Sequence, residues 1–121
     1  MILLVEDEPG ILNLVSVNLL RRGYEVAEAA NGAEALELLE DTKPELIILD
    51  LRLPEVSGWA VLEHLSGRPS SPTNLPVVVM TASVIDPDLV RSQYPCVTEV
   101  LTKPFDISTL ISTVRNVLAE K

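Results

Sequence analysis

Four short, largely apolar runs in this chain each lead into residues that could do chemistry. The runs and the residues that follow them are Met1–Val5 with Glu6 and Asp7, Leu46–Leu49 with Asp50, Val77–Met80 with Thr81, and Val97–Thr102 with Lys103. Together these side chains offer three carboxylates, a hydroxyl and an ammonium group. Carboxylates bind hard divalent cations, and hydroxyl and ammonium groups can hold phosphoryl oxygens. The set is suited to phosphoryl chemistry beside a divalent cation.

The runs also predict how these residues meet. Unbroken runs of Val, Ile and Leu are typical of strands that are covered on both faces, as in a parallel sheet. In an open parallel sheet the carboxyl ends of the strands share one edge, and ligands bind in the crevice there. Because each candidate residue follows a run, we expect all of them at that edge, although they are far apart in the sequence.

Helical patterns alternate with the runs along the whole chain. The first predicted helix has Pro9 in its first turn and ends at Gly23, and a capping box of Asn31 and Glu34 starts the second. The remaining expected elements are a strand at Tyr24–Ala29, helices near Ser57, at Asp88–Gln93 and at Ile107–Leu118, and an exposed loop at Gly67–Asn74. Five strand–helix units in a row predict an α/β fold, a single parallel sheet with helices on both faces.

Composition limits the class of protein. With 121 residues, 47% hydrophobic and 22% charged, the chain fits one globular domain over residues 1–121. Its only cysteine, Cys96, cannot form an internal disulfide, which fits the cytoplasm. We expect no signal peptide and find no run of roughly 18 apolar residues that could span a membrane. The net charge of −9 argues against direct binding to nucleic acid or an anionic membrane.

The order of these motifs resembles the receiver domain of bacterial two-component response regulators, the chemotaxis regulators among them. The resemblance rests on Glu6-Asp7, Asp50, Thr81-Ala82 and Lys103-Pro104-Phe105, and on Asp50–Pro54 followed by Ser57-Gly58. It covers the chain from about Ile2 to Leu118. It implies the flavodoxin-like receiver fold, a five-stranded parallel sheet in the order 2-1-3-4-5. That order places the switch point between the first and third strands, where the three acids would meet.

The resemblance also implies a role for each site residue. Asp50 would accept the phosphoryl group, and Asp7, Asp50 and the backbone carbonyl of Arg52 would bind Mg²⁺ directly, with Glu6 acting through water. Lys103 would pair with Asp50 at rest and with a phosphoryl oxygen afterwards, and the Thr81 hydroxyl would donate to another. The bond between Lys103 and Pro104 would be cis. Such a site needs little beyond positioning and charge stabilisation.

A receiver would act as a phosphorylation-controlled signalling switch and not as an enzyme on other substrates. Its expected partners are a sensor histidine kinase or a histidine phosphotransfer protein, and then an output domain or a downstream protein. A dimer that depends on phosphorylation is a further expectation. The chain would catalyse only its own phosphorylation and dephosphorylation.

Two other functions compete with the signalling switch as interpretations of this sequence. Phosphatases of the haloacid dehalogenase type also use an aspartate nucleophile, but they usually carry a second acid two residues later for acid–base work, where this chain has Arg52. A receiver-like interaction module that is never phosphorylated would need none of the five site residues, and all five are present.

Some positions lie outside the site pattern or depart from it. Val100 stands where many receivers carry a Tyr or Phe, so coupling through that aromatic ring is not expected here. Pro95 should end the fourth helix, which is polar and expected to be short. His64 is expected on the surface, and Cys96 and Trp59 are expected to pack in the core or at its rim.

Overall fold

The computed structural model describes residues 1–66 and 75–119, and within them strands and helices alternate. The elements in chain order are β1 (Ile2–Val5), α1 (Pro9–Arg21), β2 (Val26–Ala29), α2 (Gly32–Asp41), β3 (Leu46–Asp50), α3 (Gly58–Ser66), β4 (Val77–Thr81), α4 (Pro87–Gln93), β5 (Val97–Thr102) and α5 (Ile107–Ala119). The predicted loop Gly67–Asn74 lies outside the described residues. No described helix has the length and apolar character that crossing a membrane requires.

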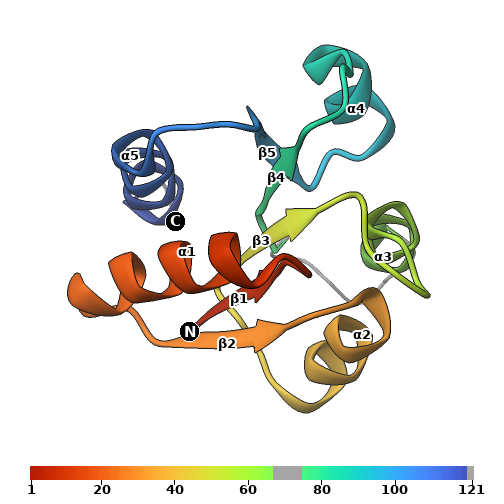
Figure 1. The fold of residues 1–121 in the computed structure, drawn as a ribbon. Coiled ribbons are helices and arrows are strands. Elements are labelled where there is room, and N and C mark those ends of the chain that lie inside the picture. Colours follow the sequence, from red (N-terminus) through yellow and green to blue (C-terminus); the bar gives the residue numbers. More distant parts are fainter. Residues whose placement is uncertain (67–74, 120–121) are drawn as a thin grey trace.

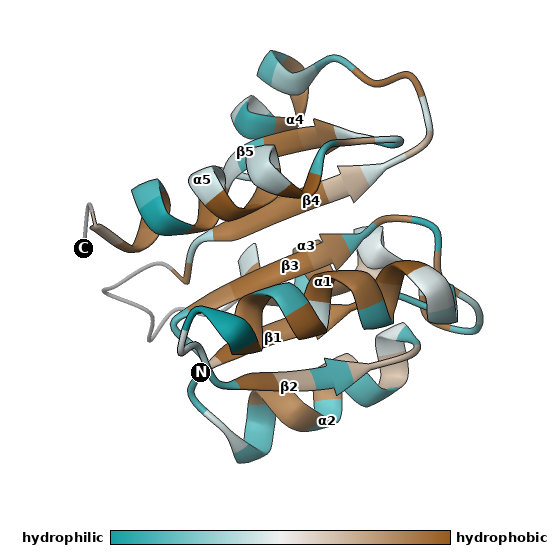
Figure 2. Ribbon diagram, turned by 60° about the vertical axis from the view of Figure 1, so that its left-hand side comes forward, coloured by the Kyte–Doolittle hydropathy of each residue, from teal (hydrophilic) through white to brown (hydrophobic). Residues whose placement is uncertain are grey.

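The five strands form one parallel sheet in the order β2-β1-β3-β4-β5, as the receiver resemblance implied (Figure 1). Helices α1 and α5 cover one face, and α2, α3 and α4 cover the other. Because successive residues of a strand point to opposite faces, β1 supplies both cores: Leu3 and Val5 pack beneath α2 and α3, and Ile2 and Leu4 beneath α1 and α5. This two-sided burial explains why the central strands are hydrophobic throughout (Figure 2).

The register of the sheet aligns the candidate residues. Val5 pairs with Leu49, so the acids after β1 lie beside Asp50 at the end of β3. Asp50 pairs with Met80, which places Thr81 one residue further along β4. Thr81 in turn pairs with Thr102, the residue before Lys103. Four separate stretches of the chain therefore end at one edge of the sheet.

The helix ends lie close to the sequence signals, and the start of the second strand differs from the prediction. The Asn31 side chain accepts a hydrogen bond from the Glu34 N–H at 2.9 Å, as in the predicted capping box. The Glu34 carboxylate, however, accepts the N–H of Ala30, one residue before the N-cap, at 3.2 Å rather than the N–H of Asn31. The second strand begins at Val26 rather than at the predicted Tyr24. Tyr24 donates its backbone N–H to Leu19 near the end of α1, so it belongs to the connection.

Candidate functional site

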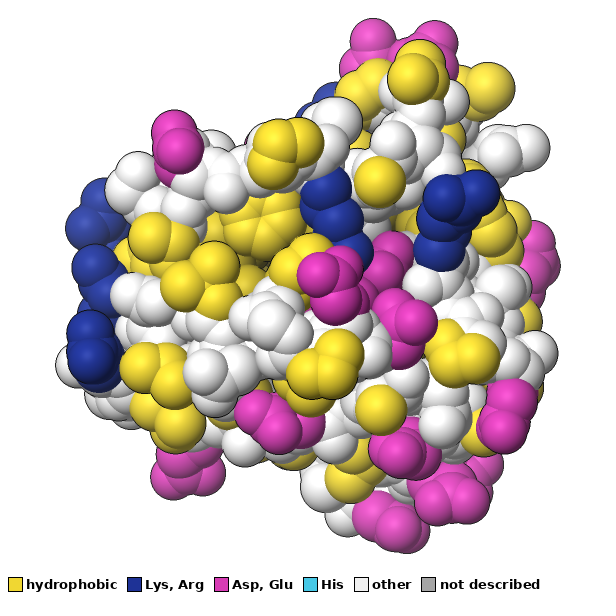
Figure 3. Space-filling view, viewed as in Figure 1, with side chains coloured by type: hydrophobic (Ala, Val, Ile, Leu, Met, Phe, Trp, Pro, Cys, Tyr) yellow, Lys and Arg dark blue, Asp and Glu magenta, His cyan; other side chains and the backbone are white. Residues whose placement is uncertain are grey.

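Three carboxylates gather where β1 and β3 end. Carboxylate oxygens of Glu6, Asp7 and Asp50 all lie within 4.8 Å of one another. Glu6 and Asp50 are buried, with 0% and 3% of their surface exposed, whereas Asp7 is exposed. Acidic side chains gather beside a basic one near the middle of the face shown in Figure 3. Buried like charges at this separation repel one another, so the cluster needs a compensating cation.

Lys103 supplies one cation to this cluster. Its ammonium donates to Glu6 Oε1 at 2.6 Å and to Asp50 Oδ2 at 2.9 Å, and its backbone N–H donates to the Thr81 carbonyl at 2.8 Å. The bond between Lys103 and Pro104 is cis, as predicted. The contact with Asp50 was expected, and the shorter contact with Glu6 was not.

Hydrogen bonds to both carboxylate oxygens hold the Glu6 side chain in place. Its Oε2 accepts hydrogen bonds from the backbone N–H groups of Asp7 at 3.0 Å and Glu8 at 3.3 Å, while Oε1 pairs with Lys103. Burial, followed by the hydrogen bond with the neighbouring Asp50 carboxyl, raises the pKa of Glu6 to about 7, although Lys103 acts in the opposite direction. The only sequence signal for this role was an acid directly after a strand buried on both faces.

Asp50 is fixed from both of its carboxylate oxygens. Oδ1 accepts the backbone N–H of Arg52 at 3.0 Å, and Oδ2 accepts the Lys103 ammonium. Behind it, Gly58 lies so close to the strand end that a Cβ there would be 2.3 Å from the Asp50 carbonyl oxygen. The start of α3 is therefore in close contact with the backbone of Asp50.

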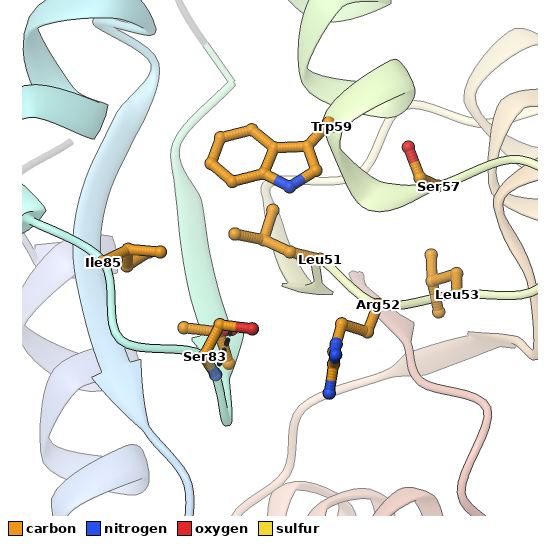
Figure 4. A pocket seen from close by; sticks show the side chains of 8 residues that line it. Leu51, Arg52, Leu53, Ser57, Trp59, Ser83 and Ile85 are labelled. Carbon is orange, nitrogen blue, oxygen red and sulfur yellow. Dashed lines mark hydrogen bonds between the residues drawn. The ribbon is translucent and has the colours of Figure 1, made fainter.

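Thr81 is fully buried next to this cluster, and its side chain bonds to the segment that follows β4. Its Oγ1 accepts the backbone N–H of Ser83 at 3.0 Å. Thr81 and Ser83 also line an open hollow of about 740 Å³, on whose lining Figure 4 shows Arg52, Trp59 and Ile85 as well. The sequence did not predict this hollow, because its walls come from separate stretches of chain.

His64, Cys96 and Trp59, which lie outside the predicted site, have the burial that the sequence predicted for them. His64 is exposed on α3, and Cys96 and Val100 are partly buried against the core beneath α2, α3 and α4. Burial raises the pKa of the Cys96 thiol, which keeps it protonated and unreactive. Trp59 is a rim residue with 38% of its surface exposed, not a core residue.

The donor set fits a magnesium ion. All three acids present oxygen ligands, which Mg²⁺ prefers, and one of them is exposed where the ion could keep water molecules. Three carboxyl groups face the single ammonium of Lys103, so acidic groups outnumber basic ones in the cluster. A divalent cation would neutralise the excess, which neither Lys103 nor the burial of the acids can do.

Comparison with known proteins agrees with this geometry. A family model described as the response regulator receiver domain matches residues 2–115. The DNA-binding dual master transcriptional regulator RpaA of Synechocystis is 37% identical over 97% of this chain and 48% of its own length. The transcriptional regulatory protein KdpE of Mycobacterium tuberculosis is 36% identical over 95% of this chain and 49% of its own length. The chain thus spans about half the length of these curated relatives.

Solved structures give the same result at the level of the fold. The chemotaxis protein CheY4 of Vibrio cholerae superposes with a TM-score of 0.82 at 30% identity, over 96% of each chain. The receiver domain of a histidine kinase from Syntrophus aciditrophicus gives 0.84 at 36% identity, covering 98% of this chain and 89% of its own. These matches do not support the alternatives of a dehalogenase-type phosphatase or an unphosphorylated module. The chain belongs to the receiver-domain family of two-component response regulators.

Proposed function

We propose that this receiver domain switches state when Asp50 accepts a phosphoryl group from a phosphohistidine of a sensor kinase or phosphotransfer protein. The observation that carries the proposal is the Lys103 ammonium, which bridges Asp50 and Glu6 beside the exposed Asp7. In the reaction the donor's P–N bond breaks, a P–O bond to an Asp50 oxygen forms, and the histidine leaves with its electron pair.

The surrounding residues are arranged to stabilise the product. Once Asp50 carries the phosphoryl group as an acyl phosphate, Lys103 can move its hydrogen bond from Asp50 to a phosphoryl oxygen while it still donates to Glu6. The Thr81 hydroxyl, buried one strand away, can donate to another phosphoryl oxygen. Asp7, Asp50 and the backbone carbonyl of Arg52 would hold Mg²⁺, with Glu6 acting through water as well as through Lys103. The ion would supply positive charge for the transferring phosphoryl group.

The proposal also covers the binding partners of the domain and its location in the cell. We expect a single receiver domain over residues 1–121 that acts in the cytoplasm, catalyses only its own phosphorylation and dephosphorylation, and passes its state to an output domain or a downstream protein. A dimer that forms on phosphorylation would be one such output. With a net charge of −9, the chain itself is not expected to bind nucleic acid or a membrane surface.

Phosphorylation by a small donor tests the assignment of Asp50. The protein is incubated with phosphoramidate and Mg²⁺, and the modified residue is mapped by mass spectrometry. We expect one phosphoryl group on Asp50 and none on the Asp50→Asn variant. Asp41→Asn, which changes an exposed acid on α2, is the matched control and should behave like wild type. Stable phosphorylation of the Asp50→Asn variant at the wild-type rate would refute the assignment.

A further inference from the structure

The hollow beside the site is much larger than a phosphoryl group requires. Its volume of about 740 Å³ lies in the range of small-molecule sites. Apolar side chains make much of its lining, which consists of Leu51, Arg52, Leu53, Ser57, Trp59, Thr81, Ser83 and Ile85. Thr81 of the acidic site and Trp59 of α3 therefore line the same space, and that space leaves room for side chains to move (Figure 4).

One wall of the hollow is bonded directly to Thr81. The Ser83 backbone N–H donates to Thr81 Oγ1 at 3.0 Å, and Ile85 follows two residues later in the segment between β4 and α4. If the Thr81 hydroxyl turns toward a phosphoryl group on Asp50, this hydrogen bond must move with it or break. If the bond moves with the hydroxyl, the segment that carries Ile85 is displaced relative to Trp59, and if the bond breaks, that segment is released from Thr81.

The opposite rim is bonded to the far end of α4. The Trp59 and Tyr94 rings lie 6.0 Å apart at their centroids, tilted by 44°. Tyr94 caps the C-terminus of α4, and its hydroxyl donates to Glu63 Oε1 of α3 at 2.5 Å. Aromatic contacts of this kind have a preferred geometry, so a shift of one ring favours a shift of the other. The C-terminal end of α4 is thereby attached to α3 through side chains.

We propose that Trp59 carries the state of the phosphoacceptor site to α4 in this chain. When Thr81 turns toward the phosphoryl group, the hollow closes, Ile85 approaches Trp59, and the indole leaves water. Tyr94 follows the indole, and the C-terminal end of α4 moves with it. The apolar walls favour this closure, because a partly exposed aromatic ring gains by burial. The inference rests on the proposed phosphorylation of Asp50, and it assigns to α3 a coupling role that Val100 in β5 cannot fill with an aromatic ring.

The chain contains a single tryptophan, so its fluorescence reports on this position alone. We would phosphorylate the full chain with phosphoramidate and Mg²⁺ and measure quenching of Trp59 by acrylamide before and after. The quenching constant should fall by about half as the indole leaves water. Intact-mass measurement on the same sample reports the phosphoryl group. A phosphorylated protein with unchanged or increased quenching would overturn the inference and leave the proposed function standing. A protein that gains no phosphoryl group would remove both.

Two variants test the path from Thr81. Thr81→Ala removes the hydroxyl that accepts from Ser83, and Ile85→Ala removes the apolar side chain that is expected to approach the indole. In samples shown by mass to be phosphorylated, each should lose most of the fall in quenching. If both variants keep the full wild-type fall, Trp59 does not respond through this segment and the inference is wrong.

The link to α4 is tested by hydrogen exchange at its last turn, where the Tyr94 N–H donates to the Val90 carbonyl. Phosphorylation should change exchange at this amide at least about twofold in wild type, because the turn moves with the ring of residue 94. Tyr94→Leu should abolish that response while Trp59 quenching still falls. Tyr24→Leu, at a partly buried tyrosine next to Met1 and Gly23, is the matched control and should keep both responses. A Tyr94→Leu protein that keeps the exchange response would contradict the coupling.

Discussion

At the scale of single residues, the site depends on how charge is shared among Glu6, Asp50 and Lys103. The Lys103 ammonium lies 2.6 Å from one acid and 2.9 Å from the other, and all three side chains are buried or nearly so. Their environment raises the pKa of Lys103 as well, because hydrogen bonds and charge from the two acids outweigh the effect of burial. Lys103 therefore stays protonated at neutral pH, and Glu6 is the member of the group that can gain or lose a proton there.

Stability without metal should record the titration of Glu6. Its pKa is about 7 in the folded protein against an ordinary 4.5, so between these pH values the folded state holds a proton that the unfolded chain has lost. Glu6 therefore stabilises the fold most at low pH, and this contribution declines as pH rises from about 4.5 to 7. Melting temperatures measured in chelator from pH 5 to 8 should show the decline in wild type and in Glu37→Gln, an exposed control. The decline should be missing in Glu6→Gln. A wild-type curve parallel to the Glu6→Gln curve would contradict the shifted pKa.

Metal affinity should separate Asp7 from Glu6. Both Glu6 oxygens already accept hydrogen bonds, whereas no described residue donates to the Asp7 carboxylate. Asp7→Asn should weaken Mg²⁺ binding by more than about tenfold, and Glu6→Gln by clearly less, in calorimetric titration. Glu8→Gln, at the exposed acid next in sequence, should bind Mg²⁺ almost as wild type does. Equal losses for Asp7→Asn and Glu6→Gln would show that both acids bind the ion in the same way.

The lifetime of the phosphorylated state should depend on Arg52. The side chain is exposed, lines the hollow beside Asp50, and forms no ion pair with the described residues, so it is available to fold across a phosphoryl group. An arginine in that position can pair with phosphoryl oxygens and hinder the attacking water. Arg52→Ala should lose phosphate several-fold faster in Mg²⁺ buffer, and Arg22→Ala, at the exposed C-cap of α1, should not. A rate that is unchanged or slower would leave Arg52 as a surface charge.

At the scale of elements, the precision of the site depends on the contact between α3 and the end of β3. Gly58 begins α3, its N–H donates to the Leu51 carbonyl at 3.1 Å, and a Cβ there would lie 2.5 Å from the Leu51 Cα. The neighbouring atoms belong to the backbone and cannot turn aside. Only glycine lets the helix start this close to Asp50, the proposed phosphoacceptor.

Gly58→Ala should therefore cost stability and activity together. We expect a loss of about 1–3 kcal/mol in the free energy of unfolding, as for other overpacked positions, and slower phosphorylation because Asp50 is displaced. Gly10→Ala in α1 is the matched control, since nothing lies within 4 Å of its Cβ position. That change should be neutral or stabilising by up to about 1 kcal/mol. Denaturant unfolding measures both variants, and equal effects would mean that the close approach at Gly58 is not limiting.

At the scale of the whole molecule, the two faces of the sheet differ in how they are packed. The face under α1 and α5 closes around Ile2, Leu4, Ile48 and Met80 and carries no residue of the hollow. The face under α2, α3 and α4 holds Trp59 and Ile85 at the hollow and Tyr94 at the end of α4, a helix of seven residues. A short helix held largely by side-chain contacts can shift at small cost, whereas the central strands cannot. Movement after phosphorylation is therefore expected on this second face.

The sequence by itself determined the architecture and most of the positions in the site. Strands buried on both faces need continuous apolar runs, and the residues after such runs must meet at one edge of a parallel sheet. The strand order and the cis bond before Pro104 came from the receiver resemblance, and the structure confirms both. The chemical roles of the site residues remain predictions with the experiments given above.

Only the tertiary structure decided which residues from distant parts of the chain contact one another, because the local sequence around each residue does not predict its partner. The pairing of Lys103 with Glu6 depends on where two strand ends lie in space, 97 residues apart in the chain. The contact of Trp59 with Tyr94 depends on where the end of α4 lies relative to α3, and neither helix has a sequence pattern that predicts this contact. The hollow at Thr81 has walls from three separate stretches. Periodicity records whether a side chain is buried, whereas distances between elements are set by how the elements pack.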